Sequence, residues 1–306
     1  MTVDLLDLEM AAPEPVPTAE NPYALGWRYP RGEGAEDADL IPLTEDDLVF
    51  PQEGDFVVNN AAHDDDRLYL KAVFRRRIED RPELRLLSDH LIDFQHPALA
   101  KYLGPDLILF NGEIRPWDKS EAVFPVVDMR ARPLFVVEIT SPSTRRVDLT
   151  RKMHVFYLVG VPFYVLIDLP TGGGRRPMGN VAFQAGPAGY ERLPREPDGR
   201  VWLEVVEVSL AIEGDHVVCY DRAGARIPNY SELADERDKA EARAAAEAAK
   251  AAEAEARATA EATKAAEAEA RAAAEAAEVK RLRDELAALR ARLSTGTDTP
   301  PGTPNS

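Results

Sequence analysis

The sequence predicts a mixed α/β fold, a layer of β-strands packed with helices, that continues into a β-rich extension and one long C-terminal helix. Three patterns in the 306 residues indicate this class. Residues 59–78 have the apolar spacing of a helix, and four later segments are strand-like, the last three of them short and apolar. Residues 231–293 consist almost wholly of Ala, Glu, Arg and Lys. A helix, then strands, then a further helix and strand is typical of a layered domain.

The first predicted helix begins near Asn59, with Asp64, Asp65 and Asp66 early and three arginines late, as the helix dipole favours. A second helix is predicted over 144–159, with Asp148 in its first turn. The predicted strands of the core are Leu86–Phe94, Pro105–Phe110, Leu134–Thr140 and Pro162–Leu169.

Downstream of residue 175, short strand patterns alternate with turn residues such as Asp198-Gly199. They predict a β-meander that extends or flanks the sheet. Its predicted strands are Val181–Gln184, Tyr190–Leu193, Val201–Leu203, Ser209–Ile212 and His216–Tyr220.

Residues 231–293 contain neither Gly nor Pro and predict a single helix of about 95 Å. A 14-residue segment nearly repeats within it, a shift of two heptads. Leucines at 282, 286, 289 and 293 then follow at 4-3-4 spacing, which predicts a coiled coil that joins copies of the chain. The alternative is a solvated spacer helix. Residues 294–306, rich in Pro, Thr and Gly, predict a disordered tail.

The formal net charge is −17, but the acidic residues are concentrated at the start of the chain. Residues 1–55 hold 14 acidic and 2 basic residues, whereas residues 56–230 are nearly neutral. We expect residues 1–50 to form an acidic, mostly irregular arm. A nearly neutral central segment can carry local basic patches, so the total charge does not exclude a DNA substrate.

Several classes of protein are disfavoured by composition. No apolar run approaches the roughly 18 residues that a membrane span needs. The first residues carry acids where a signal peptide would carry Lys or Arg. The single cysteine, Cys219, excludes a disulfide scaffold and a cysteine-ligated zinc site. These features predict a cytoplasmic protein with no membrane partner.

Two acids flank apolar strands: Asp106 precedes one, and Glu138 lies near the end of another. An acid at such a position must be paired, hydrogen-bonded or metal-bound, because a buried lone carboxylate costs several kcal/mol. Pairing of the strands would bring both to one edge of the sheet. Together with the backbone carbonyl of Ile139 they would form a hard oxygen site suited to Mg²⁺ or Mn²⁺.

A polar segment follows Glu138 and leads into the second predicted helix. Its Ser and Thr side chains can cap that helix, and Lys152 lies one turn beyond Asp148. The lysine could orient or help deprotonate a water, or neutralise charge developing on a phosphate. Possible phosphate contacts are Ser141, Thr144, Arg145 and Arg146.

Pro105-Asp106, the stretch Leu134–Tyr157 and the stretch Gly160–Asp168 resemble the Uma2 family of endonucleases, within the PD-(D/E)XK nuclease superfamily. The resemblance covers roughly residues 45–293. It implies a restriction-endonuclease-like core over 51–230, with Asp106 and Glu138 as metal ligands and Lys152 as the catalytic lysine. His63 on the first helix and Thr140, two residues after Glu138, are possible accessory residues.

Two positions depart from the pattern of the family. Thr140 stands where a lysine is expected two residues after the glutamate, and Asn59 stands where many relatives carry a glutamate. Two functions therefore remain open. One is Mg²⁺-dependent hydrolysis of phosphodiester bonds in duplex DNA, with Asp106, Glu138 and Lys152 as catalytic residues. The other is a catalytically weak or inactive nuclease-like module for DNA binding or assembly.

Overall fold

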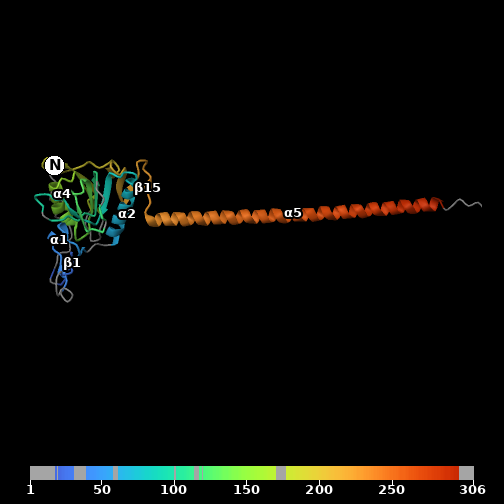
Figure 1. The fold of residues 1–306 in the computed structure, drawn as a ribbon, viewed down its shortest axis with the longest axis horizontal. Coiled ribbons are helices and arrows are strands. Elements are labelled where there is room, and N and C mark those ends of the chain that lie inside the picture. The colour runs from blue at the N-terminus through green and yellow to red at the C-terminus, as the bar shows by residue number, and fades with distance from the viewer. Residues whose placement is uncertain are drawn as a thin grey trace, which may run out of the picture. The chain divides into compact units, whose positions relative to one another are not determined.

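The computed structural model describes residues 18, 20–30, 39–57, 61–99, 101–113, 117–118, 120–169 and 177–295, with side chains to Arg292. Two compact units are found, Met1–Tyr230 and Ser231–Ser306. The first combines several mixed and antiparallel sheets with helices, and the second contains the long C-terminal helix (Figure 1).

A six-stranded sheet forms the centre of the first unit, in the order β11-β10-β9-β8-β6-β4. Strands β8 and β9 are parallel and all other neighbours are antiparallel, so the sheet is mixed. Its strands are β4 (Leu84–Ser88), β6 (Leu107–Asn111), β8 (Arg132–Ile139), β9 (Phe163–Asp168), β10 (Gly179–Gly186) and β11 (Gly189–Arg192).

Both faces of this sheet are buried, which explains why its strands are apolar runs rather than alternating patterns. On one face, α2 (Ala61–Arg77) packs through Phe74 against Phe135 of β8. On the other face, α4 (Met153–Leu158) packs through Phe156 against Tyr164. Figure 1 shows α2 and α4 on opposite sides of the sheet. Polar residues on the α4 face are therefore enclosed between layers.

The β-rich extension is an antiparallel four-stranded sheet in the order β12-β13-β14-β15. Tyr69 of α2 connects to it, because its hydroxyl donates to the Ile227 carbonyl at 2.6 Å and accepts from the Cys219 N–H at 3.0 Å. The strands are β12 (Val201–Leu203), β13 (Val208–Glu213), β14 (His216–Tyr220) and β15 (Arg226–Ile227).

The segment before residue 58 is more ordered than the predicted irregular arm. Its described parts form β1 (Gly26–Arg28), β2 (Ile41–Pro42), β3 (Asp55–Val57) and α1 (Glu45–Val49). Thr44 and Asp47 form a capping box at the start of α1. Leu43, Leu48 and Val49 are buried in the core on the α4 face. An arm boundary at residue 50 is thus wrong for residues 39–50, because these apolar side chains belong to the core; residues 1–17 lie outside the described part.

Other boundaries also differ from the prediction. The segment 86–94 is split into β4 and β5 (Leu91–Asp93) by a turn at Asp89, whose φ is 56°. Strand β5 pairs in parallel with β7 (Val123–Pro125), a strand that the sequence pattern did not indicate. The helix predicted over 144–159 consists of α3 (Arg145–Val147), a π-helical turn η3 (Asp148–Lys152) and α4.

The helix predicted over 231–293 is observed as α5 (Tyr230–Thr295), 66 residues long. Its described side chains are almost all exposed, including Leu282, Leu286 and Leu289. A disordered tail is predicted over 294–306, but residues 294 and 295 belong to α5, and residues 296–306 lie outside the described part. Within that part, no helix has both the length and the apolar character of a membrane span.

Candidate active site

Antiparallel pairing of β6 and β8 brings the two predicted acids together. Leu107 is the register partner of Val137, so Asp106 and Glu138 occupy adjacent positions at one end of the pair. Asp106 Oδ2 accepts a hydrogen bond from the Ile139 N–H at 2.8 Å. The Ile139 backbone therefore meets Asp106 through its amide, and its carbonyl as a metal ligand stays a prediction.

Lys152 lies between two buried carboxylates. Its Nζ is 3.0 Å from Glu138 Oε2 and 2.9 Å from Asp148 Oδ1. The lysine side chain is 9% exposed and each acid is 1% exposed. Glu138 Oε1 is also buried and accepts no hydrogen bond from any described residue. The charged groups thus share a nearly dry environment, and one carboxylate oxygen has unused acceptor capacity.

Asp148 is a site residue that the sequence analysis did not propose. It begins the π-helical turn that ends at Lys152, and the Tyr164 hydroxyl donates to its carbonyl at 2.8 Å. A π-turn leaves backbone groups without their usual helical partners and often occurs at functional sites. The i,i+4 spacing of Asp148 and Lys152 is visible in the sequence. The spacing alone predicts an acid in the first turn of a helix and a lysine one turn later, because the burial of the pair is a tertiary property.

His63 of α2, the helix on the other face of the sheet from α4, also reaches Asp106. Its Nε2 lies 3.3 Å from Asp106 Oδ2. Burial lowers the pKa of His63, but the negative charge of Asp106 and their hydrogen bond outweigh burial and raise it above its usual value. Burial likewise raises the pKa of Asp106, but the charge of His63 outweighs it and holds that pKa below its usual value. The pair thus favours a charged carboxylate beside a protonated imidazole.

The other two acids behave differently from Asp106. Burial raises the pKa of Glu138 well above its usual value, and Lys152 offsets this only in part. Burial also raises the pKa of Asp148. For Lys152, burial lowers the pKa, but the charges of Asp148 and Glu138 outweigh burial and raise it. Lys152 therefore remains protonated, and the site holds three carboxyl groups beside two cationic groups, Lys152 and His63.

The residues proposed as phosphate contacts are used mainly within the protein. Arg145 makes a bidentate ion pair with Asp168, at 2.8 and 3.1 Å, and both side chains are buried. Thr140 donates to the same carboxylate at 2.8 Å. Ser141 and Thr144 bond to each other in the turn that precedes α3. Phosphate contact is thus wrong for Arg145 and Ser141, because both are buried and already bonded; Thr140 supports Asp168.

Two arginines of the same segment face outward instead. Arg146, proposed as a phosphate contact, pairs with Glu45 of α1. Arg151 Nη2 lies 2.6 Å from Asp46 Oδ1, and Lys101 Nζ lies 2.7 Å from Asp46 Oδ2. Acidic side chains of α1 therefore lie against the exposed bases of the helical segment.

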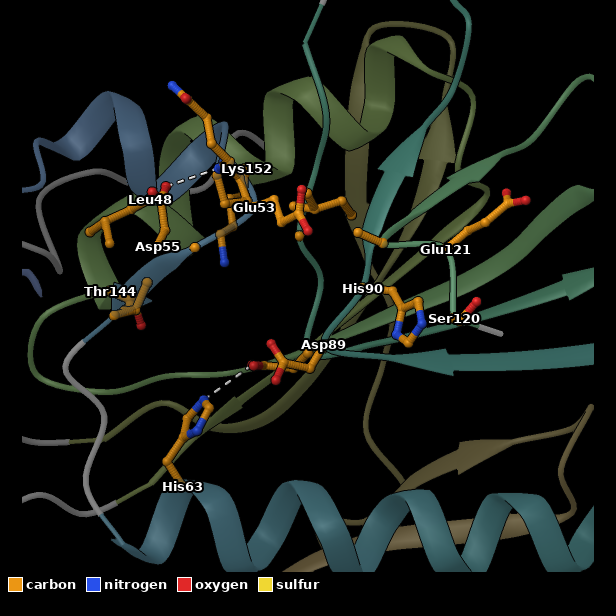
Figure 2. A pocket seen from close by; sticks show the side chains of 18 residues that line it. Leu48, Glu53, Asp55, His63, Asp89, His90, Ser120, Glu121, Thr144 and Lys152 are labelled. Carbon is orange, nitrogen blue, oxygen red and sulfur yellow. Dashed lines mark hydrogen bonds and ion pairs between the residues drawn. The ribbon is translucent and has the colours of Figure 1, made fainter. Parts of the chain in front are cut away.

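A cavity of about 370 Å³ opens beside these groups, and His63, Asp106, Thr144 and Lys152 are among its lining residues (Figure 2). The loop before β3 and the turn between β4 and β5 form other walls. Acidic lining side chains outnumber basic ones; they include Glu53, Asp55, Asp89 and Glu121. The cavity gives a small ligand access to Asp106 and Lys152.

Carboxylate oxygens and the free lone pairs of Glu138 suit a hard divalent cation. Within the described residues no group of three or more His, Cys, Asp or Glu side chains has a ready-made metal-ligand arrangement. Any cation at Asp106 and Glu138 would thus complete its coordination with backbone, water or substrate oxygens. This pattern is usual for Mg²⁺, which keeps several waters.

Comparison with known proteins gives one family. The model of the Uma2 family, described as "Putative restriction endonuclease", matches residues 52–213, which are 162 of the 306 residues. Among solved structures, a crystal structure from Anabaena variabilis is titled "a putative nuclease belonging to DUF820". It is 16% identical to this chain and covers 56% of it and 95% of its own chain, with a TM-score of 0.38. No curated protein matches the chain.

Proposed function

Because the chain belongs to the Uma2 family, we propose that it is an endonuclease that hydrolyses phosphodiester bonds of duplex DNA with the help of Mg²⁺ or Mn²⁺. The observation that carries the proposal is the convergence of Asp106, Glu138 and Lys152 beside a cavity. We further propose that the six-stranded sheet and its helices are a restriction-endonuclease-like core of the PD-(D/E)XK type. The protein would act in the cytoplasm.

Asp106 and Glu138 would hold the metal ion, with the Ile139 carbonyl as a third oxygen. The presence of three carboxyl groups beside two cationic groups, Lys152 and His63, and the unused Glu138 Oε1 support this assignment. When bound, such an ion polarises a phosphodiester and makes water a better nucleophile. Its charge would also lower the raised pKa of Glu138 toward its usual value.

Lys152 would act as a fixed positive charge rather than as a proton acceptor, because Asp148 and Glu138 keep it protonated. Its position permits stabilisation of negative charge that develops on the phosphate. Asp148 would position this ammonium group. His63, held charged by Asp106, is placed to contact a phosphate oxygen or to donate a proton at the edge of the cavity.

The lysine that usually follows the glutamate in this superfamily is replaced by Thr140, which is bonded to Asp168. We propose that Lys152, reaching Glu138 from the helical segment, takes its place. The same replacement favours the second candidate function, a catalytically weak or inactive nuclease-like module that binds DNA. Asn59, the other departure from the family, lies outside the described residues.

Cleavage of plasmid DNA by the full chain, with metal and with EDTA, tests the proposal. We expect cleavage with Mg²⁺ or Mn²⁺, none with EDTA, and a loss of at least about 10³-fold in Asp106→Asn and in Glu138→Gln, since each removes a charged ligand. The matched control is Glu113→Gln, a carboxylate that is 93% exposed. Cleavage that resists EDTA would refute metal dependence. DNA binding without cleavage under either metal would favour the inactive module.

We also propose that the chain forms a homo-oligomer through α5, which would bring two sites to one duplex. The exposed leucines at the C-terminal part of this helix support the proposal.

A further inference from the structure

Helix α5 carries an exposed apolar stripe. Val279, Leu282, Leu286 and Leu289 are each about half exposed, at 48%, 48%, 54% and 57%. They are spaced by three, four and three residues, so they lie on one face of the helix. Large apolar side chains in a regular seam, on a helix whose other residues are mostly Ala and charged residues, indicate a helical partner.

The stripe fixes a heptad register for the whole helix. In that register Val279 and Leu286 occupy a positions, and Leu282 and Leu289 occupy d positions. Upstream, every a position from 244 to 272 is an alanine. The a positions therefore continue the register of the leucines with small side chains, whereas the d positions upstream alternate between Glu and Ala.

Charges beside the seam identify the partner and its direction. In a parallel, in-register pair, each g residue faces the e residue five positions later on the other helix. Between residues 243 and 290 there are seven such pairs. Four join opposite charges, three set an arginine against an alanine, and none joins like charges. The four are Lys250 with Glu255, Lys264 with Glu269, Glu278 with Arg283, and Glu285 with Arg290.

The positions of the positive and negative charges distinguish a parallel from an antiparallel pair. The first two pairs have the base at g, and the last two have the acid at g. An antiparallel pair through the same leucines would set g against g and e against e. In the register that sets Leu282 against Leu286, Glu285 would then meet Glu285 and Arg283 would meet Arg283, so both flanks would be repulsive at the centre of the pair.

From these observations we infer that α5 is a parallel, in-register coiled coil with a second copy of the same chain, anchored by residues 279–293. The alanine seam contributes less, because three d positions are the acids Glu247, Glu261 and Glu275, which would face their own copies. The pattern of attractive or neutral g–e pairs ends on the N-terminal side of residue 243, because Glu236 would face Glu241 there. The leucine segment is thus the part that holds the pair together.

The parallel direction determines how two proposed active sites could meet one DNA duplex, and this part of the inference rests on the proposed nuclease function. The two folded units would be attached at the same end of the coiled coil. In an antiparallel pair through the leucines, which would be centred near residue 284, the attachment points at residue 230 would be about 160 Å apart, from twice 54 residues at 1.5 Å each. A parallel pair thus allows two active sites to reach neighbouring phosphodiesters on one duplex.

Light scattering and cysteine cross-linking of the full-length protein test the inference without any measurement of cleavage. We expect twice the mass of one chain. Ala268→Cys, at a d position, should form a disulfide-linked dimer under mild oxidation, whereas Ala270→Cys, at an outward f position, should not. In an antiparallel pair through the leucines, residue 268 would face no helix of the partner. The native Cys219 is buried and does not interfere.

A charge exchange tests the flanking pairs. The double variant Glu278→Arg/Glu285→Arg sets arginine against arginine and should weaken association at least about tenfold. A mixture with Arg283→Glu/Arg290→Glu should restore dimers, because each unlike pair is attractive again. A monomer in the wild type, equal cross-linking at residues 268 and 270, or dimers unaffected by the double variant would overturn the inference. Such a result would leave the nuclease proposal standing.

Discussion

The short segment from Arg145 to Lys152 carries four bases with two different environments. Arg145 and Lys152 point inward and bind acids that are almost fully buried. Arg146 and Arg151 point outward and bind the acids of α1, with 57% and 42% of their own side chains exposed. The ion-pair distances are similar: 2.8 Å for Arg145 to Asp168 and 2.6 Å for Arg151 to Asp46.

Ion pairs of similar length can therefore contribute very different amounts to the free energy of unfolding. Removal of one partner of a buried pair leaves a desolvated charge and costs about 3 to 5 kcal/mol. An exposed pair contributes about 0 to 1 kcal/mol, because water replaces the lost partner. The inward bases therefore fix the geometry of the site, whereas the outward bases can exchange one anionic partner for another at little cost.

The largest effect should come from the inward lysine. We expect Lys152→Ala to reduce the rate of DNA cleavage by about 10² to 10⁴-fold, because a positioned charge at the reacting phosphate is lost. Binding of Mn²⁺, measured by calorimetry, should persist because Asp106 and Glu138 remain. Lys239→Ala on α5 is the control and should cleave at the wild-type rate. Wild-type turnover in Lys152→Ala would contradict the role of this residue.

The neighbouring arginines test the energetic contrast directly. Arg145→Met should lower the free energy of unfolding by about 3 to 5 kcal/mol, since Asp168 would stay buried without its cation. Arg146→Met should lower it by no more than about 1 kcal/mol. Urea unfolding of both variants gives the comparison, and Arg145→Lys, which keeps the charge, should fall between them. Equal losses of unfolding free energy in Arg145→Met and Arg146→Met would show that the buried and the exposed ion pair contribute equally to stability.

The contrast also shows what the sequence could predict. Strands β6, β8 and β9 were predictable because apolar runs bounded by Pro or Gly indicate buried strands. The convergence of Asp106 and Glu138 followed from their place at the ends of two such strands. Lys152 was identified by resemblance to the Uma2 family, and its contact with Glu138 agrees with that assignment.

The direction in which a charged side chain points could not be predicted in the same way. Arg145 and Arg146 are adjacent and chemically alike, yet one is buried and the other exposed. The π-helical turn changes the rotation of the helix by one residue, and no local propensity indicates it. The acids of α1 that meet Arg146 and Arg151 lie about a hundred residues earlier, in a segment whose composition suggested an irregular arm.

Asp66 is an intermediate case, a buried acid whose partner His216 is half exposed. Burial raises the pKa of Asp66 from 3.8 to about 6, although His216 and the Val217 N–H lower it. Between these two pH values the folded state keeps a proton that the unfolded chain has lost. The stability from this group is therefore complete below about pH 4 and is lost as pH rises through about 6.

The difference in unfolding free energy between wild type and Asp66→Asn should accordingly shift by about 2 to 3 kcal/mol between pH 4 and 7.5, with the wild type relatively weaker at high pH. Urea unfolding across this range measures it. Asp65→Asn changes the adjacent exposed acid and should leave the pH dependence of the wild type unchanged. A constant difference between wild type and Asp66→Asn would show that Asp66 is ionised throughout.

The smallest effect concerns the outward bases. We expect the double variant Glu45→Gln/Asp46→Asn to bind duplex DNA about three to ten times more tightly at low salt, because Arg146, Arg151 and Lys101 would lose their competing anions. The slope of log affinity against log salt should steepen by about one to two, the number of new phosphate contacts. Fluorescence anisotropy with a labelled duplex at several salt concentrations measures both quantities.

The matched control is Asp235→Asn/Glu236→Gln on α5, which changes the net charge by the same two units far along the chain from these bases. If affinity rises equally in both double variants, the gain reflects total charge, and the acids of α1 do not mask a DNA-binding surface. A gain confined to the α1 variant would show that the outward bases exchange carboxylates for phosphates. The inward bases cannot make this exchange, because their carboxylate partners are buried with them.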